Sequence, residues 1–186
     1  MAAALALLGE AGFRGVTMTA IAERTGAPIG SVYHRFASRE ILLAELWVEL
    51  IDSFQTDFLA ELRKGDGKRA AMHTLRWIRK HPNKARVFLL YRREQLMTGD
   101  WPENIKDRAE KLSAMLDKGI TDFTRRFLGR ADRKNIDRVV FCLIHVPSSA
   151  ARSFLEAGKP VPKYYDRFVE EAYQCLLAPY RKDVAP

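Results

Sequence analysis

Apolar residues along this chain recur at intervals of three and four positions. Over residues 39–64 they include Leu43, Leu46, Leu50 and Phe54, which a helix places on one face. No segment keeps the alternation of apolar and polar residues, bounded by turn signals, that a strand needs. The pattern therefore predicts an all-α protein.

Glycine, proline and aspartate interrupt this pattern repeatedly, and these residues end or restart helices. The breaks divide the chain into about nine helices. We expect them at Ala2–Ala11, Thr19–Thr25, Ile29–Phe36, Arg39–Lys64, Lys68–Lys80, Lys84–Met97, Glu103–Leu128, Arg133–Ala157 and Tyr164–Leu177.

The second and third of these helices are only about seven residues long, and a helix of that length is not stable alone in water. They must therefore pack against their neighbours. Two short helices joined by a glycine-containing turn predict a helix-turn-helix. We expect Thr17 to cap the second helix, Gly26 to form the turn and Pro28 to begin the third helix. Ser38 is expected to cap the fourth.

The third helix has a predicted inner and a predicted outer face. Val32 and Phe36 lie one turn apart and are expected to point inward, so the other side chains face solvent. An α-helix fits the major groove of DNA, where Arg35 could read a guanine or bind a phosphate. Tyr33 and Arg39 are suited to phosphates. The residues predicted to contact DNA are Thr17, Thr19, Ile29, Gly30, Ser31, Tyr33, His34, Arg35 and Arg39.

This stretch resembles the N-terminal signature of the tetracycline-repressor family. The matching residues are Gly12-Phe13, Thr17, Ile21-Ala22, Gly26, Gly30–Phe36 and Arg39–Leu43. The resemblance implies a helix-turn-helix DNA-binding domain over residues 1–47 and a helical ligand-binding and dimerisation domain over residues 48–186. It further implies a repressor that binds a palindromic operator as a dimer and is released by a small-molecule inducer.

Three features depart from the family pattern. Ala27 and Pro28 replace a valine and a small polar residue, and Arg35 stands where histidine is common. The basic residues that the family often carries before its first helix are also missing, which suggests the hypothesis that the natural chain begins upstream of Met1.

The segment Val139–Val146 is apolar nearly all round, and such a helix is buried on more than one side. A second copy of the chain is the simplest cover, so the last two helices are expected to form a four-helix bundle with their symmetry mates. An internal core helix is the alternative. The predicted dimer interface comprises Val139, Val140, Leu143, Phe168, Val169, Tyr173 and Leu176.

Polar and aromatic residues interrupt the apolar helices of the second domain, as they do around pockets for small molecules. The predicted pocket comprises His73, Trp77, Tyr91, Gln95, Phe123, Cys142 and His145. The apolar and aromatic nature of this predicted pocket favours an apolar or aromatic inducer. Pro147 is expected to kink the eighth helix. By the family mechanism, the inducer moves the sixth helix and the fourth helix transmits the motion.

The formal net charge is +8, but its distribution does not locate a DNA-binding face. Residues 1–50 hold four Arg and five Glu, for a balance of −1, and the remaining residues carry +9. A generally basic surface explains the excess equally well, so the DNA-binding hypothesis rests on the pattern of residues.

The sequence gives less support to a membrane protein, an exported protein or an enzyme. No apolar run approaches the roughly 20 residues that cross a bilayer. Met1–Leu8 lacks the basic leader of a signal peptide, and the two cysteines suggest no disulfide framework, so a cytoplasmic location is expected. Cys142 and His145 supply at most half of a metal site, so neither a metal, a cofactor nor an enzymatic activity is predicted. An activator, or an adaptor with a vestigial helix-turn-helix, remains as an alternative regulator.

Overall fold

The computed structural model describes residues 1–91 and 101–182, and this part of the chain contains helices and no strand. The predicted all-α fold is confirmed. The α-helices are α1 (Ala2–Gly15), α2 (Met18–Thr25), α3 (Ile29–Arg35), α4 (Arg39–Lys64), α5 (Gly67–Lys80), α6 (Pro82–Leu90), α8 (Glu103–Leu128), α9 (Arg133–Val140), α10 (Val146–Glu156) and α11 (Tyr165–Leu176). A π-helical turn, η1 (Phe141–His145), joins α9 to α10, and a 3₁₀ turn, η2 (Ala178–Tyr180), follows α11.

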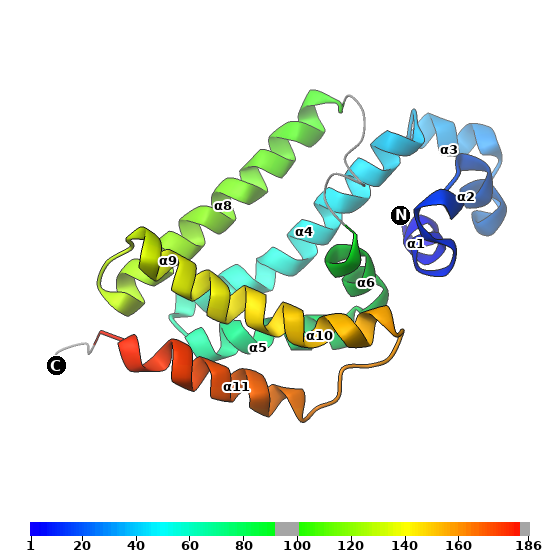
Figure 1. Ribbon diagram of the computed structural model, residues 1–186. Helices are drawn as coiled ribbons and strands as arrows, with labels where there is room; N and C mark the ends of the chain where they lie inside the picture. The colour runs from blue at the N-terminus through cyan, green and yellow to red at the C-terminus, as the bar shows by residue number, and fades with distance from the viewer. Residues whose placement is uncertain (92–100, 183–186) are drawn as a thin grey trace.

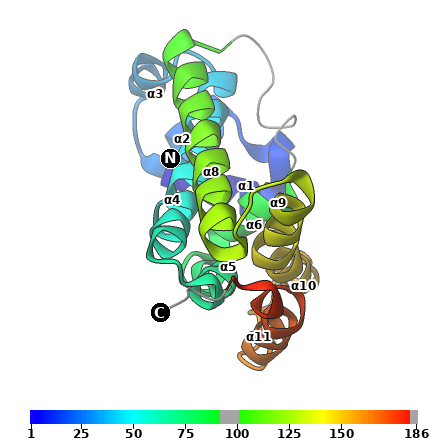
Figure 2. The same ribbon diagram turned by 90° about the vertical axis from the view of Figure 1, so that its left-hand side faces the viewer.

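The helices form a small N-terminal unit and a larger bundle (Figure 1). Helices α1, α2 and α3 pack together beside the first turns of α4. Helix α4 then runs alongside α8, as the view turned by 90° also shows (Figure 2). Helix α5 is central to the bundle, because it contacts α4, α6, α10 and α11.

Two hydrophobic clusters correspond to these two parts. The N-terminal core contains Leu8, Ile21, Val32 and Leu43, together with Val87 from α6. The second core joins residues of α4, α5, α8, α9, η1, α10 and α11. Since α6 and α8 also contribute to the N-terminal core, the two parts share side chains across the predicted boundary after residue 47. That boundary itself stays a prediction.

The long helices begin and end where the pattern predicts. Helices α4 and α8 have the predicted bounds, because strong stop signals flank both. Gly65 and Gly129 adopt left-handed conformations directly after them.

Helix α6 was predicted wrongly as Lys84–Met97. It begins at Pro82, whose fixed φ suits a first turn, and it ends before Tyr91, which is extended.

The predicted eighth helix is divided by the π turn η1. The Val146 N–H donates to the Phe141 carbonyl, five residues back, rather than four. Pro147 follows directly, and a proline ring cannot approach the carbonyl four residues before it in a regular helix. A kink was predicted at Pro147, and the structure has a π turn directly before this residue.

Arg39 ties the start of α4 to the end of α1. Its Nε donates to the Val16 carbonyl and its Nη2 to the Phe13 carbonyl. The guanidinium carbon also lies 4.2 Å from the centroid of the Phe13 ring, within the range of a cation–π interaction. One side chain therefore joins α4 to the loop that leads into α2.

Helix α1 bends sharply at Gly12, which has φ 66° and ψ −168°. This conformation is almost exclusive to glycine, because a Cβ atom would clash with the backbone. The bend turns the chain from α1 toward Phe13 and Val16, the residues that Arg39 contacts.

Gly12→Ala should lower the free energy of unfolding by about 1–3 kcal/mol, because alanine is strained in this conformation. Gly9→Ala is the matched control. It lies within the same helix with open space around its Cα, so it should raise stability by about 0.5–1 kcal/mol. Urea denaturation of both variants measures the two effects. Equal stabilities for the two variants would contradict the account of the bend.

Arg39→Ala should lower the free energy of unfolding by about 2 kcal/mol, because two half-buried carbonyls lose a charged donor. Arg35→Ala, the same change on an exposed side chain four residues earlier, should alter it by less than about 0.5 kcal/mol. Thermal and urea unfolding compare the two. If both variants were as stable as the parent protein, the claim that the Arg39 hydrogen bonds stabilise the fold would be wrong.

Candidate nucleic-acid interface

The turn between α2 and α3 has the geometry that its residues predict. The Thr17 hydroxyl accepts a hydrogen bond from the Ala20 N–H at 3.0 Å and caps α2. Gly26 ends α2 in the left-handed region, with φ 66°. Pro28 then occupies the N-cap position of α3. At the next junction, the Ser38 hydroxyl accepts from the Ile41 N–H and caps α4.

These features hold α3 with one face inward. Val32 is buried in the N-terminal core, and Phe36, which follows the helix, is half-buried against the same core. Tyr33 is 51% exposed and Ile29 is 44% exposed. The outward residues are Ile29, Gly30, Ser31, Tyr33, His34 and Arg35, the same six that the sequence places on the outer face of α3.

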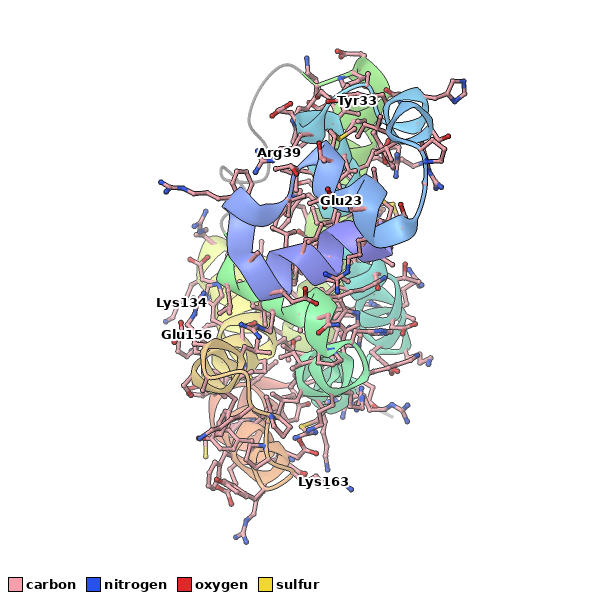
Figure 3. The ribbon with its side chains drawn as sticks, turned by 90° about the vertical axis from the view of Figure 1, so that its right-hand side faces the viewer. Glu23, Tyr33, Arg39, Lys134, Glu156 and Lys163 are labelled. Carbon is pink, nitrogen blue, oxygen red and sulfur yellow. The ribbon has the colours of Figure 1, made fainter. Side chains whose placement is uncertain are left out.

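This face carries groups suited to DNA. Ser31 and Tyr33 supply hydroxyls, His34 an imidazole and Arg35 a guanidinium. No side chain lies near the Cα of Gly30, so a ligand could approach the backbone there. Figure 3 shows Tyr33 and Lys163 toward opposite ends of the molecule.

The remaining predicted DNA contacts differ in their surroundings. Thr17 and Thr19 are exposed, although the Thr17 hydroxyl already accepts the α2 cap. Arg39 is only 24% exposed, and its guanidinium points to the Phe13 and Val16 carbonyls. Its phosphate contact stays a prediction, and it would require the side chain to leave those carbonyls.

Within residues 1–91, few cations near α3 are available to phosphates. Both terminal nitrogens of Arg24 donate to the Glu10 carboxylate, at 2.5 and 2.6 Å, and these hydrogen bonds lower the pKa of Glu10. Arg14 and Arg35 are exposed and form no ion pair with a described residue. Because phosphate contacts supply much of the affinity for DNA, a single copy of this surface would bind weakly.

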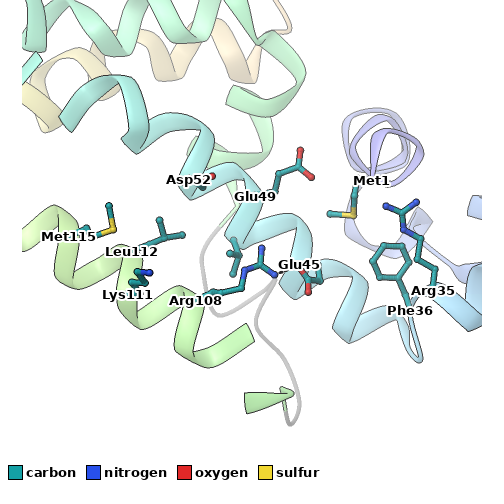
Figure 4. A pocket seen from close by; sticks show the side chains of 11 residues that line it. Met1, Arg35, Phe36, Glu45, Glu49, Asp52, Arg108, Lys111, Leu112 and Met115 are labelled. Carbon is teal, nitrogen blue, oxygen red and sulfur yellow. Dashed lines mark hydrogen bonds and ion pairs between the residues drawn. The ribbon is translucent and has the colours of Figure 1, made fainter. Parts of the chain in front are cut away.

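A groove of 710 Å³ adjoins this surface (Figure 4). Its α4 wall is acidic and its α8 wall is basic, and the pair Glu45–Arg108 crosses it at 2.7 Å. The lining residues are Met1, Arg35, Phe36, Glu45, Val48, Glu49, Asp52, Arg108, Lys111, Leu112 and Met115. Acidic and basic side chains balance along the groove, so its charge favours neither an anion nor a cation.

The residues predicted to form an inducer pocket have differing surroundings. His73 and Trp77 pack edge-on against Phe54, and both donate hydrogen bonds to α4 carbonyls. Burial lowers the pKa of His73, which favours a neutral imidazole. Phe123 stacks on Phe127 within the second core.

The other predicted pocket residues lie elsewhere. Cys142 is buried in the second core, and burial raises the pKa of its thiol to about 11. Tyr91 contacts α1, and His145 faces solvent beside Phe141. Gln95 lies outside the described residues. A shared pocket for these residues stays a prediction.

Four predicted dimer-interface residues are instead covered by their own chain. Val139, Leu143, Val169 and Tyr173 are at most 7% exposed and belong to the second core. They cannot touch a second copy without unfolding this core, so the alternative of an internal core applies to them. Val140 is half-buried, and Phe168 and Leu176 are exposed.

The outer face of the same region carries large apolar residues that are not in the predicted interface. These are Phe141, Tyr164 and Tyr180, which are 51–60% exposed. The sequence offers a signal for two of them, because Tyr164 lies four residues before Phe168 and Tyr180 four residues after Leu176, and positions four apart share a helix face.

In the part of the chain that the structure describes, no helix is long and apolar enough to span a membrane. Within residues 1–91 and 101–182, no three His, Cys, Asp or Glu side chains are placed to hold a metal ion.

Comparison with known proteins agrees with the geometry of α1 to α4. Residues 1–46 match the family described as bacterial regulatory proteins, tetR family. A crystal structure from Shewanella sp. PV-4, provisionally described as a tetR family transcription regulator, is similar with a TM-score of 0.67 and 22% sequence identity. The similarity covers 92% of this chain and 91% of that one. No curated protein matches the chain.

The predicted resemblance is thus confirmed, and the larger bundle has the fold of the Shewanella protein. Residues 1–46 of this chain are thus similar to the N-terminal region of the tetR family of bacterial regulatory proteins, and the chain shares its overall fold with the Shewanella structure.

Proposed function

We propose that the protein is a dimeric repressor that binds a palindromic operator and is released by a small molecule. The observation that carries the proposal is the exposed face of α3, held outward by the α2 cap and by Val32. An outward recognition helix fits the major groove, where its side chains can meet base edges.

Dimerisation would compensate for the few free cations that residues 1–91 place near α3. Two recognition helices about one DNA turn apart bind a palindrome far more tightly than one, because the second binding event becomes intramolecular. The outer face of α11 and η1 supports this arrangement. Phe168 and Leu176 lie on α11, Tyr164 directly precedes this helix, and Phe141 and Tyr180 lie on η1 and η2. Exposed apolar surface of this kind is typical of protein interfaces.

This interface replaces the one expected from the sequence. The proposed four-helix bundle remains, but its contacts come from the outward side chains rather than from Val139, Leu143, Val169 and Tyr173. A two-fold axis would bring the same face of each copy together.

Buried polar groups in the larger bundle bear on release by an inducer. Two buried polar atoms, Gln55 Oε1 and Thr74 Oγ1, have no hydrogen-bond partner among the described residues. Such atoms favour a ligand that supplies one, since an unsatisfied buried polar group is unfavourable. A preference of about 1–3 kcal/mol for the released state would weaken operator affinity about 5–150-fold.

Arg35→Ala should weaken binding to a duplex selected by the parent protein from a random pool, by about 5–150-fold, because a base or phosphate contact is lost. Fluorescence anisotropy at two or more salt concentrations measures the affinity. Arg63→Ala removes an exposed arginine at the far end of α4 and should leave the affinity unchanged. Equal losses for the two variants would indicate a general charge effect and refute the α3 assignment.

Phe168→Asp should convert a dimer to a monomer at micromolar concentration, because it places a charge in the apolar interface. Met115→Asp is the matched control, since Met115 is similarly exposed, at 45%, but lies on α8. Analytical ultracentrifugation gives the oligomeric state. A monomeric parent protein, or a dimeric Phe168→Asp variant, would contradict the proposed interface.

A further inference from the structure

Helix α6 lies between the two hydrophobic cores. Its Ala85 is buried in the second core and its Val87 in the N-terminal core. The neighbouring Phe88 ring contacts Trp47 and Phe54 of α4, with centroid distances of 5.6 and 5.2 Å. A movement of α6 would therefore displace side chains in both hydrophobic cores.

The end of α6 is held by hydrogen bonds in two directions. Arg152 of α10 donates from Nη2 to the Leu89 carbonyl at 2.9 Å. Tyr91, the residue after α6, donates its hydroxyl to the Leu8 carbonyl of α1 at 3.1 Å. The outer helices of the bundle are thus joined through the end of α6 to α1.

The Leu8 carbonyl lies about one turn of α1 before the Gly12 bend. The Tyr91 hydroxyl lies directly over the bend, 3.6 Å from the position that a Cβ atom on Gly12 would take. It therefore contacts α1 at the point where the chain changes direction.

Packing around this contact is incomplete. A groove of 280 Å³ runs between α1 and α6, and its lining is Leu8, Gly9, Gly12, Arg86, Leu90 and Tyr91. Because side chains do not fill the space there, the position of the α1 end depends on the hydrogen bond more than it would in a close-packed interface.

The bend leads directly to the residues that hold the helix-turn-helix. Phe13 and Val16 follow it and accept the two Arg39 hydrogen bonds, and Thr17 then caps α2. A displacement at Leu8 and Gly12 would pass through these contacts to α2 and α3.

We propose that Tyr91 is a positioning residue for DNA binding, which acts by holding the α1 bend through the Leu8 carbonyl. The end of α6 then reaches the recognition helix through α1, in addition to the expected route through α4. This inference rests on the proposed DNA-binding function for its affinity readout, but the local order of α1 can be measured without DNA.

Tyr91→Phe tests the proposal, because it removes the hydroxyl and keeps the ring. Hydrogen exchange of the backbone amides at residues 9–17 should accelerate about fivefold or more, with little change at residues 67–80. The affinity for the duplex selected by the parent protein should fall about fivefold at a temperature well below unfolding. Tyr165→Phe, a half-buried tyrosine on α11, should alter neither quantity.

Two results would overturn the inference. One is an unchanged exchange rate at residues 9–17. The other is a lower thermal midpoint with full affinity for the duplex, which would mean that Tyr91 only stabilises the fold. If the parent protein selects no duplex, the proposed DNA-binding function fails, and the exchange of residues 9–17 alone decides whether Tyr91 holds the bend.

Discussion

The surface proposed to read DNA depends on keeping seven residues helical. Helix α3 is shorter than a helix that could persist in water by itself. It is supported by Val32 in the N-terminal core, by the capped α2 before it and by α4 after it. Arg39 fastens that last support, since it ties α4 to the carbonyls that precede α2. The outward face of α3 is therefore a property of the whole N-terminal unit and not of the α3 segment alone.

Features decided within a few residues were predictable from the sequence. The caps at Thr17 and Ser38 each involve an acceptor and a donor three residues apart, and Gly26 needs only its own left-handed conformation. The bounds of α4 and α8 follow from a continuous apolar stripe and a terminal glycine. The all-α fold and the family resemblance rest on such local signals, and both are confirmed.

Features decided by distant partners were not predictable. Arg39 has an ordinary place in a phosphate-binding pattern, yet its acceptors lie 23 and 26 residues earlier in the chain. Tyr91 finds its acceptor 83 residues away. Apolar spacing indicates that one side of a helix is covered but does not identify the cover. For that reason Val139 and Leu143 were assigned to a partner when their own chain buries them, while Phe141 between them points outward.

The π turn before Pro147 has a consequence for the register of the helix. Val139, Leu143, Pro147, Ala151 and Leu155 are all buried and lie at a strict interval of four residues. In a regular α-helix, that interval rotates by about 40° per step, so five such positions would spiral away from a common side. The wider turn takes up part of this rotation. A chain with one residue fewer between Val140 and Val146 would lose that correction, and α10 would turn a different set of side chains toward the core.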